Sequence, residues 1–162
     1  MARWSDLEAE ARPLATLVAE RFESTGLIML GTLRRDGRPR ISPCEFLVRD
    51  GRIELGMMWR SRKALDLLHD PRCILHSTTT ATDGSQGDAK VSGRALPVDD
   101  AAERVRHSRA FEEKTGWGPT GDEWHLFAVD MEEVAFQRFG DERRVLVWRP
   151  GGPAVERTPP TE

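Results

Sequence analysis

Two Asp-Gly pairs, at residues 36–37 and 50–51, are the features that most restrict how this chain can fold. Asp-Gly favours the tight primed turn that joins two antiparallel strands. The runs around these turns cover residues 27–33, 40–48 and 52–58, and the last run alternates apolar and polar side chains with the period of a strand. We therefore expect an antiparallel meander of three strands. A parallel doubly wound sheet is excluded for this part of the chain, because successive parallel strands need a long crossover between them.

Further short apolar runs, separated by turn residues, follow along the chain. Strands are expected at residues 73–79, 89–98, 125–131, 134–139 and 144–148. Pro39 and Pro43 each remove a backbone donor from the second strand, so that strand should lie at an edge, a bulge or an opening of the sheet. About eight short strands with two or three helices indicate a mainly β fold, an antiparallel barrel with flanking helices over its ends.

Helical spacing marks three segments, of which the first lies at the amino end. There Ser5 and Glu8 form a capping-box pattern, and Pro13 predicts a kink or a second helix start. One apolar stripe on this segment consists of Leu7, Ala11, Leu14, Val18 and Phe22. The other two helices are expected at residues 62–69 and from Asp99 or Asp100 to about Glu112. Residues 1–150 are expected to form a single domain, and residues 151–162, which are rich in Pro and Gly, a flexible C-terminal tail.

Composition excludes several classes of function. The chain has 162 residues and a formal net charge of −3, from 24 Lys+Arg against 27 Asp+Glu, so no overall positive field attracts nucleic acid. No apolar stretch reaches the roughly 20 residues of a membrane-spanning helix, and the first residues do not resemble a signal peptide. We expect a cytoplasmic protein that binds neither nucleic acid nor membrane. The two cysteines, Cys44 and Cys73, are expected to be small buried apolar groups.

The familiar catalytic motifs are missing. The sequence has no Gly-x-Ser-x-Gly, no phosphate-binding Gly-Lys loop and no dinucleotide-binding glycine fingerprint. The four histidines have no zinc-ligand spacing, so no metal site is expected. These histidines are His69, His76, His107 and His125.

The segment Ser61-Arg62-Lys63 has an unusual charge pattern for the start of a helix. If Ser61 is the N-cap, two cations occupy the first turn, where the helix dipole disfavours each by roughly 0.3–1 kcal/mol. A phosphate at this point would remove the conflict, because it can accept hydrogen bonds from free backbone N–H groups, the hydroxyl, the guanidinium and the ammonium. Alternatively, these side chains are simply solvated in a fraying turn.

Three separated motifs, in order, resemble the pyridoxamine 5'-phosphate oxidase-like flavin-binding split barrels. Residues 56–64, Gly-Met-Met-Trp-Arg-Ser-Arg-Lys-Ala, continue to Asp70-Pro71-Arg72 as the strand, turn and short helix of that superfamily do. Residues 36–43, Asp-Gly-Arg-Pro-Arg-Ile-Ser-Pro, are similar to its first hairpin, and residues 90–95, Lys-Val-Ser-Gly-Arg-Ala, to a later strand. The resemblance implies a Greek-key antiparallel split β-barrel that forms a homodimer. It also implies FMN, or the related deazaflavin coenzyme F-420, in a groove between the subunits.

The resemblance also implies a role for particular residues. Arg62 and Lys63 would hold the phosphate with Ser61 beside them, and Arg40 would assist at the phosphate or the ribityl chain. The main chain at Met57 and Met58 would pass the flavin ring. Arg144 would reach the flavin from the partner subunit, although an exposed hairpin arginine is an equally good interpretation. The Arg-x-His substrate motif of true pyridoxamine phosphate oxidases is absent from residues 139–144, and Asp88 replaces a common glutamine, so a vitamin B6 phosphate is not expected as substrate.

The leading hypothesis is therefore a flavin-dependent oxidoreductase acting on an unidentified small molecule, with the coenzyme carrying the hydride and no side-chain acid or base required. Trp117, Trp124 and Trp148 are candidates for an apolar wall, or for ordinary packing. An F-420 tail would favour cations at the groove mouth, where candidates are Arg34, Arg35, Arg38, Arg60 and Arg62. Another alternative is a non-catalytic flavin- or haem-binding protein, with His69, His76 or His125 as an axial ligand. A nucleic-acid-binding small barrel is disfavoured, because the chain has no Tyr and an aromatic fraction of 7%.

Overall fold

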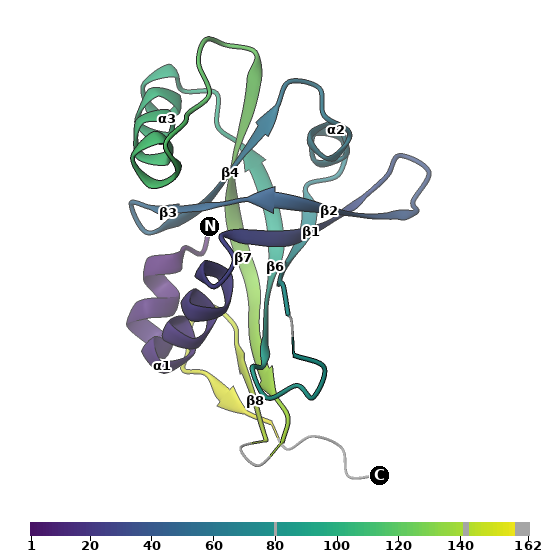
Figure 1. Cartoon of the computed structure of the whole chain (residues 1–162), viewed down its shortest axis with the longest axis vertical. Helices are drawn as coiled ribbons and strands as arrows, with labels where there is room; N and C mark the ends of the chain where they lie inside the picture. Colours follow the sequence, from purple (N-terminus) through teal and green to yellow (C-terminus); the bar gives the residue numbers. More distant parts are fainter. Residues whose placement is uncertain (80, 141–142, 158–162) are drawn as a thin grey trace.

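The computed structural model describes residues 1–79, 81–140 and 143–157, and Figure 1 shows their arrangement. The helices are α1 (Trp4–Glu23), α2 (Arg62–His69) and α3 (Ala101–Thr115). The strands are β1 (Leu27–Leu33), β2 (Pro39–Glu45), β3 (Leu47–Arg49), β4 (Arg52–Met58), β5 (Arg72–Ser77), β6 (Asp88–Pro97), β7 (Trp124–Arg138), β8 (Arg144–Trp148) and β9 (Val155–Glu156). None of the helices within these ranges combines the length and the apolarity that a membrane-spanning segment requires.

All strand pairs are antiparallel, which confirms the mainly β fold expected from the sequence. The strands follow the order β2-β1-β5-β6-β7-β4-β3, with β8 and β9 continuing from β7. β2 and β3 form the two ends of this path and do not pair with each other, so the sheet is open along a seam between them. β2 carries Pro39 and Pro43 at an unpaired edge, as their missing donors require.

The expected three-strand meander is wrong, because the run 40–48 divides at Phe46 into strands at opposite ends of the sheet. Phe46 is buried, and its ring meets that of Phe22 edge-on at 5.5 Å. Burying this side chain turns the backbone from the β1–β2 hairpin into the β3–β4 hairpin. The turn of the second hairpin has positive φ at both Asp50 and Gly51, as in the primed turns that Asp-Gly favours.

β7 is a single strand of 15 residues where the sequence suggested two. Its pairing with β6 shifts register at a bulge: Ser92 pairs with Glu133 and Gly93 with Met131, so Glu132 is an extra residue. A bulge of this kind bends a strand without ending it. The polar pair Glu132-Glu133 that suggested a break therefore marks the bulge.

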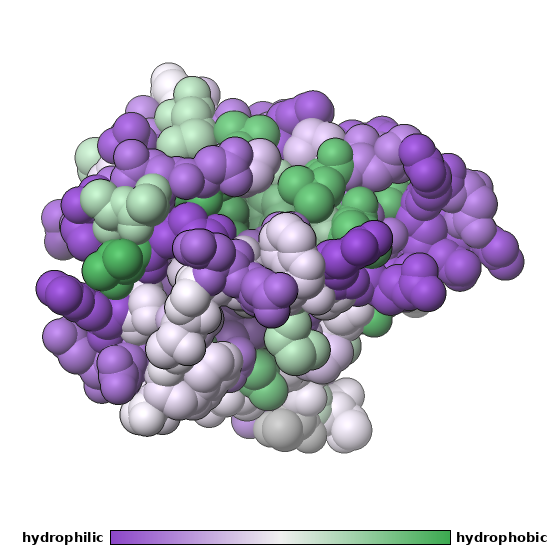
Figure 2. All heavy atoms as spheres, turned by 90° about the horizontal axis from the view of Figure 1, so that it is seen from above, coloured by the Kyte–Doolittle hydropathy of each residue, from purple (hydrophilic) through white to green (hydrophobic). Residues whose placement is uncertain are grey.

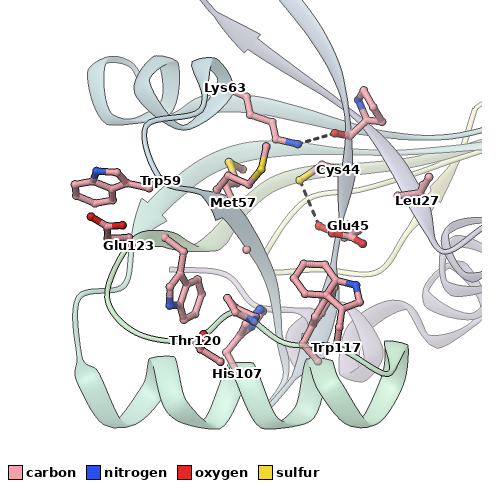
Figure 3. Close-up of a pocket in the computed structure, with 16 residues that line it drawn as sticks. Leu27, Cys44, Glu45, Met57, Trp59, Lys63, His107, Trp117, Thr120 and Glu123 are labelled. Atoms are coloured by element: carbon pink, nitrogen blue, oxygen red, sulfur yellow. Dashed lines mark hydrogen bonds between the residues drawn. The ribbon is translucent and has the colours of Figure 1, made fainter.

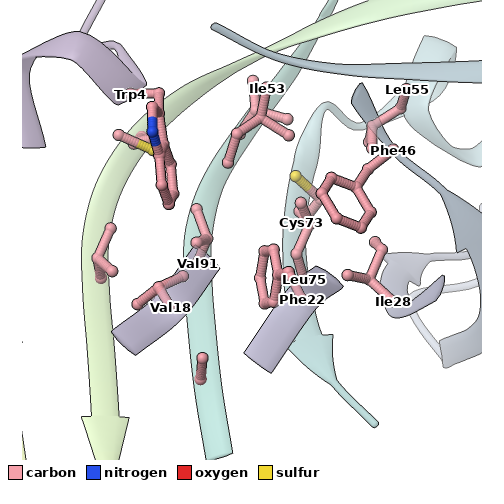
Figure 4. Packing of buried hydrophobic residues seen from close by; sticks show 14 of the residues in the cluster. Trp4, Val18, Phe22, Ile28, Phe46, Ile53, Leu55, Cys73, Leu75 and Val91 are labelled. Carbon is pink, nitrogen blue, oxygen red and sulfur yellow. The ribbon is translucent and has the colours of Figure 1, made fainter. Parts of the chain in front are cut away.

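The apolar stripe of α1 packs onto the sheet and forms the core with it, as predicted (Figure 4). The helix is kinked at Ala11, where φ is −148° and ψ is 50°, two residues before Pro13. Ser5 is not the N-cap. The N-cap is Arg3, two residues earlier, because the Asp6 carboxylate accepts the Arg3 N–H at 2.7 Å and Ser5 N–H bonds to Gly51 O at 3.2 Å. Both cysteines are buried, as expected.

α1 is also fastened to the last part of the chain. The Glu10 carboxylate accepts hydrogen bonds from Trp148 Nε1 at 2.9 Å, Gly151 N at 3.0 Å and Gly152 N at 3.1 Å. Within the stretch that we expected to be a flexible tail, Val155–Glu156 form β9 and pair with β8. The rest of that stretch, 158–162, lies outside the described residues.

Candidate functional site

The turn between β4 and α2 has a conformation that its side chains do not favour. Arg60 has φ of +53°, in the left-handed region that costs a non-glycine residue roughly 1–2 kcal/mol. The turn is closed by Ser61 N–H to Met58 O at 3.1 Å, and Arg60 N–H donates to His125 Nε2 at 3.2 Å. The Trp59 ring stacks on the His125 ring with centroids 4.6 Å apart. These contacts hold the strained backbone and thereby fix where α2 begins.

The start of α2 is built as an anion site would be. α2 begins at Arg62 with Ser61 as the N-cap residue, as predicted, and its first turn contains no acidic residue. The Ser61 hydroxyl makes no capping bond, and its buried Oγ has no hydrogen-bond partner within the described part of the chain. Buried polar atoms are rarely left unpaired, so this atom indicates that a ligand is to be bound. Arg62 is exposed, and Lys63 Nζ donates to Pro43 O at 2.6 Å.

Arg40 lies on β2 and faces α2. Its Nε bonds to Asp66 Oδ2 at 2.6 Å, and the Thr32 hydroxyl donates to the same oxygen at 2.9 Å. Asp66 is buried on α2, so this ion pair holds the helix against β1 and β2. The guanidinium of Arg40 is thus positioned beside α2 by a carboxylate on the helix itself.

Next to this helix start, a pocket of about 580 Å³ opens between β4, α3 and the loop that connects α3 to β7 (Figure 3). Lys63 enters it from α2, Met57 from β4 and His107 from α3. Viewed from above, this side of the molecule gathers hydrophobic side chains among hydrophilic ones (Figure 2). The aromatic side chains of the lining are Trp59, Phe111, Trp117 and Trp124. The volume and the mixture of aromatic walls with few polar groups are typical of a small-molecule site.

A buried charge network lies behind His107, which is one of the residues that line the pocket. Glu54 is fully buried, and its Oε2 lies 2.9 Å from His107 Nδ1. Arg49 binds both oxygens of this carboxylate, at 3.1 and 2.9 Å, and Arg52 Nη2 binds Oε1 at 3.0 Å. Both arginines also bind Glu103 of α3. Burial raises the pKa of Glu54, but hydrogen bonds from His107 and Arg49 outweigh it and hold this pKa below its ordinary value.

The network predicts how stability depends on pH. His107 and Arg49 lower the pKa of Glu54, and Arg106 and Arg49 lower that of Glu103 to about 2, from the ordinary 4.5. Because these pKa values are depressed in the folded state, their stabilisation is complete above about pH 4.5 and is lost as the pH falls toward 2. The urea concentration at the midpoint of unfolding should therefore decrease as the pH is lowered from 5 to 3. Glu103→Gln should flatten this decline, whereas the exposed Glu113→Gln should not; a wild-type midpoint that stays constant over this range would contradict the assignment.

The structure brings together some of the residues expected to bind a cofactor. Met57, Met58 and Lys63 line the pocket, and Ser61, Arg62 and Arg40 lie at the adjoining start of α2 or face that helix. Arg144 is not among them in a single chain: it lies on β8, at the opposite end of the long axis in Figure 1, and its Nε bonds to Glu156 at 3.1 Å.

Of the other residues considered in the sequence, some line the pocket and some lie elsewhere. Trp117 and Trp124 line the pocket, whereas Trp148 is fully buried in the core, which is the ordinary packing that the sequence left open for it. Asp88 starts β6, where it pairs with Lys90 at 3.1 Å, and it does not line the pocket. The arginines suggested for a groove mouth lie mostly in the β1–β2 turn, where Arg34 and Arg38 both pair with Asp36.

The three histidines considered as haem ligands do not line the pocket. His125 Nε2 already accepts the Arg60 N–H, and burial lowers the pKa of His125. His76 Nδ1 lies 2.6 Å from Ser77 O, and His69 lies at the exposed end of α2. In residues 1–79, 81–140 and 143–157, no group of three or more His, Cys, Asp or Glu side chains is arranged to hold a metal ion.

Comparison with protein families gives one match, and it covers most of the chain. The model for pyridoxamine 5'-phosphate oxidase matches residues 14–138, which include strands β1 to β7, the start of α2 and the pocket. The chain belongs to this family. The open antiparallel sheet and its helices agree with the split barrel of the pyridoxamine phosphate oxidase-like proteins. A comparison with curated proteins finds no match.

Solved structures of the same fold have varied ligands. PhzG from Burkholderia lata, in complex with tetrahydrophenazine-1-carboxylic acid, has a TM-score of 0.65 at 18% identity, over 91% of this chain and 89% of that one. A Clostridium acetobutylicum protein of the pyridoxinephosphate oxidase family, related to general stress protein 26, has a TM-score of 0.63 at 18% identity, over 84% and 95%. A haem-binding protein from Mycobacterium smegmatis has a TM-score of 0.58 at 17% identity, over 82% and 57%. These likenesses show the fold alone.

Sequence reasoning missed His107 as a residue of the pocket and Glu54 as its buried partner. The alternation in β4 placed Glu54 on a solvent face, but α3 covers that face and buries it. A signal was present: Glu103, His107 and Phe111 recur every four residues, and therefore share one face of α3.

Proposed function

We propose that this protein is an FMN-dependent oxidoreductase that acts on a small aromatic or otherwise planar molecule. The observation that carries the proposal is the buried, unpartnered Ser61 Oγ at a helix start whose first turn holds Arg62 and Lys63 and no acidic residue. Family membership supports the same ligand class. A terminal phosphate dianion would satisfy the hydroxyl, the free backbone N–H groups and both cations together.

Each residue has a distinct part in this proposal. Ser61, Arg62 and Lys63 would hold the phosphate, with Arg40 kept nearby by Asp66. The main chain at Met57 and Met58 would border the ring, because both residues line the adjoining pocket. When bound, the coenzyme supplies hydride transfer, and the pocket orients the substrate and excludes water.

A homodimer belongs to the proposal. Exposed apolar side chains near the helix start, including Ile41 at 71% and Met58 at 77% exposure, would be covered by a second copy. A partner subunit could then bring its own copy of Arg144 to the coenzyme, which the single chain does not.

Titration of the apoprotein with FMN and with F-420 in parallel, followed by fluorescence, tests the proposal. We expect FMN to bind at least about tenfold more tightly, because two of the five arginines that could receive the F-420 tail, Arg34 and Arg38, are paired with Asp36. The reverse preference would make the protein a deazaflavin-dependent reductase of the same fold. A Soret band after haem addition, without FMN binding, would make it a haem-binding protein and overturn the proposal.

A further inference from the structure

His107 is placed in the pocket with only one of its ring nitrogens engaged by a charged partner. Its side chain is 1% exposed, its Nδ1 lies 2.9 Å from Glu54 Oε2, and its ring stacks between Phe111 and Trp124, with centroids 5.8 and 5.7 Å away. The residue nevertheless contributes to the pocket lining. The stacking and the carboxylate together fix the ring orientation.

The hydrogen-bond chemistry of Glu54 determines which nitrogen faces the ligand space. Glu54 is bound by Arg49 and Arg52 and is therefore an ionised carboxylate, which can only accept hydrogen bonds. Nδ1 must then carry the proton, so in the neutral ring Nε2 is the basic nitrogen with a free lone pair. Nε2 points towards Gly56, a pocket residue, where an added Cβ would lie only 3.2 Å away. A glycine at this position leaves that nitrogen room.

We propose that His107 is the proton acceptor and donor of this pocket, oriented by Glu54, and that the pocket takes a planar aromatic ligand with an acidic O–H or N–H group. In the forward step the ligand O–H bond breaks, an Nε2–H bond forms, and the electron pair stays on the ligand oxygen. Glu54 remains ionised throughout and stabilises the resulting imidazolium. This inference deepens the proposed function and rests on it only in treating the pocket as the substrate site.

The surrounding charges suit this step. Behind the imidazole, two carboxylates face two guanidinium groups, so the network is close to neutral and an added proton leaves one net positive charge beside the bound anion. The charged groups around the ring are Glu54 on β4, Arg49, Asp50 and Arg52 at the β3–β4 turn, Glu103 on α3, and Arg104, whose guanidinium lies over the Trp124 ring. Lys63, Glu45 and Glu123 complete the polar lining of the pocket.

The test uses 4-nitrophenol, whose phenolate absorbs visible light, and 4-nitroanisole, which has no proton to give, with the full chain and without added coenzyme. With the wild type, bound 4-nitrophenol should appear as the phenolate at a pH about one unit lower than in free solution. In His107→Asn this shift should disappear and affinity for 4-nitrophenol should fall about tenfold, while affinity for 4-nitroanisole stays within about twofold. Asparagine is chosen because its amide N–H can replace Nδ1–H as the donor to Glu54, which preserves the structural hydrogen bond.

His125→Asn is the matched control, because His125 neighbours the pocket but its Nε2 is occupied by the Arg60 N–H. It should leave the phenolate signal unchanged. An unshifted probe with the wild type, or a full shift with His107→Asn, would overturn the inference. Should His107→Asn fail to fold, imidazole ¹⁵N NMR of the wild type decides. Binding of 4-nitrophenol should protonate Nε2 of His107, so that both ring nitrogens carry a proton, and an unchanged spectrum refutes the role. The wild type is also titrated with FMN in a separate experiment. FMN binding with an unshifted probe refutes this inference alone, and a shifted probe without FMN binding refutes the proposed function alone.

Discussion

The double variant Arg62→Glu/Lys63→Glu is expected to bind FMN at least about a thousandfold more weakly than the wild type, while remaining folded. Each cation would contribute a charge-assisted hydrogen bond of roughly 1.5–3 kcal/mol to the phosphate, and each glutamate adds repulsion; a thousandfold corresponds to about 4 kcal/mol. The fold should persist, because Arg62 is exposed and Lys63 makes its bond to a carbonyl at the surface. Fluorescence titration of FMN measures the affinity.

A charge-matched control separates a local contact from a change in net charge. Arg12→Glu/Arg109→Glu changes the charge by the same amount at two exposed positions, on α1 and α3, away from the start of α2. Its FMN affinity should remain within about threefold of the wild type, at an ionic strength where distant charges are screened. If the Arg62/Lys63 variant and this control bound FMN with equal affinity, the start of α2 could not be the phosphate-binding site.

Gly93→Ala is expected to destabilise the protein by about 3 kcal/mol or more, or to prevent its folding. A Cβ at this position would overlap the Asp130 carbonyl oxygen and lie 3.0 Å from the carbonyl carbon and 3.1 Å from Met131 Cα. All three atoms belong to the backbone of β7 at the bulge, and that strand is held by pairing on both sides. Nothing flexible can move aside, so the clash must break ladder hydrogen bonds. Urea unfolding followed by circular dichroism measures the loss.

The control for this change is Gly152→Ala. An added Cβ at this position has no neighbour within 4 Å, and the hydrogen bond from the Gly152 N–H to the Glu10 carboxylate is kept. Its unfolding free energy should stay within about 0.5 kcal/mol of the wild type. If Gly93→Ala were equally harmless, β6 and β7 could not pair in this register.

Local chemistry made several elements predictable. The bounds of α2 follow from a serine before the first turn and from Asp70-Pro71 after it, and the two hairpins follow from their Asp-Gly turns. The division of the run 40–48 was not predictable, because it depends on the packing of Phe46 against Phe22, residues far apart in sequence. The continuity of β7 depends likewise on its partner strand, since a bulge and a break look alike in one sequence.

In the candidate site, too, residues that are close in sequence were predictable and residues brought together by tertiary packing were not. Ser61, Arg62 and Lys63 are contiguous, so their conflict with the helix dipole is visible in the sequence. Glu54 and His107 are 53 positions apart and meet only because α3 crosses β4. No spacing rule predicts such a pair, and neither residue type is unusual in its own segment. The sequence therefore predicts an anion site at the start of α2 but does not predict the contact between Glu54 and His107.

The attachment of α1 has a consequence for how the protein is made. The ribosome synthesises α1 before the strands that receive it, which include β6, β7 and β8, and before the Trp148, Gly151 and Gly152 groups that bind Glu10. A nascent chain that ends after β5 has no complete surface on which the apolar stripe can be buried. α1 therefore docks only after later parts of the chain have been made, and during that interval its exposed apolar stripe is prone to aggregation.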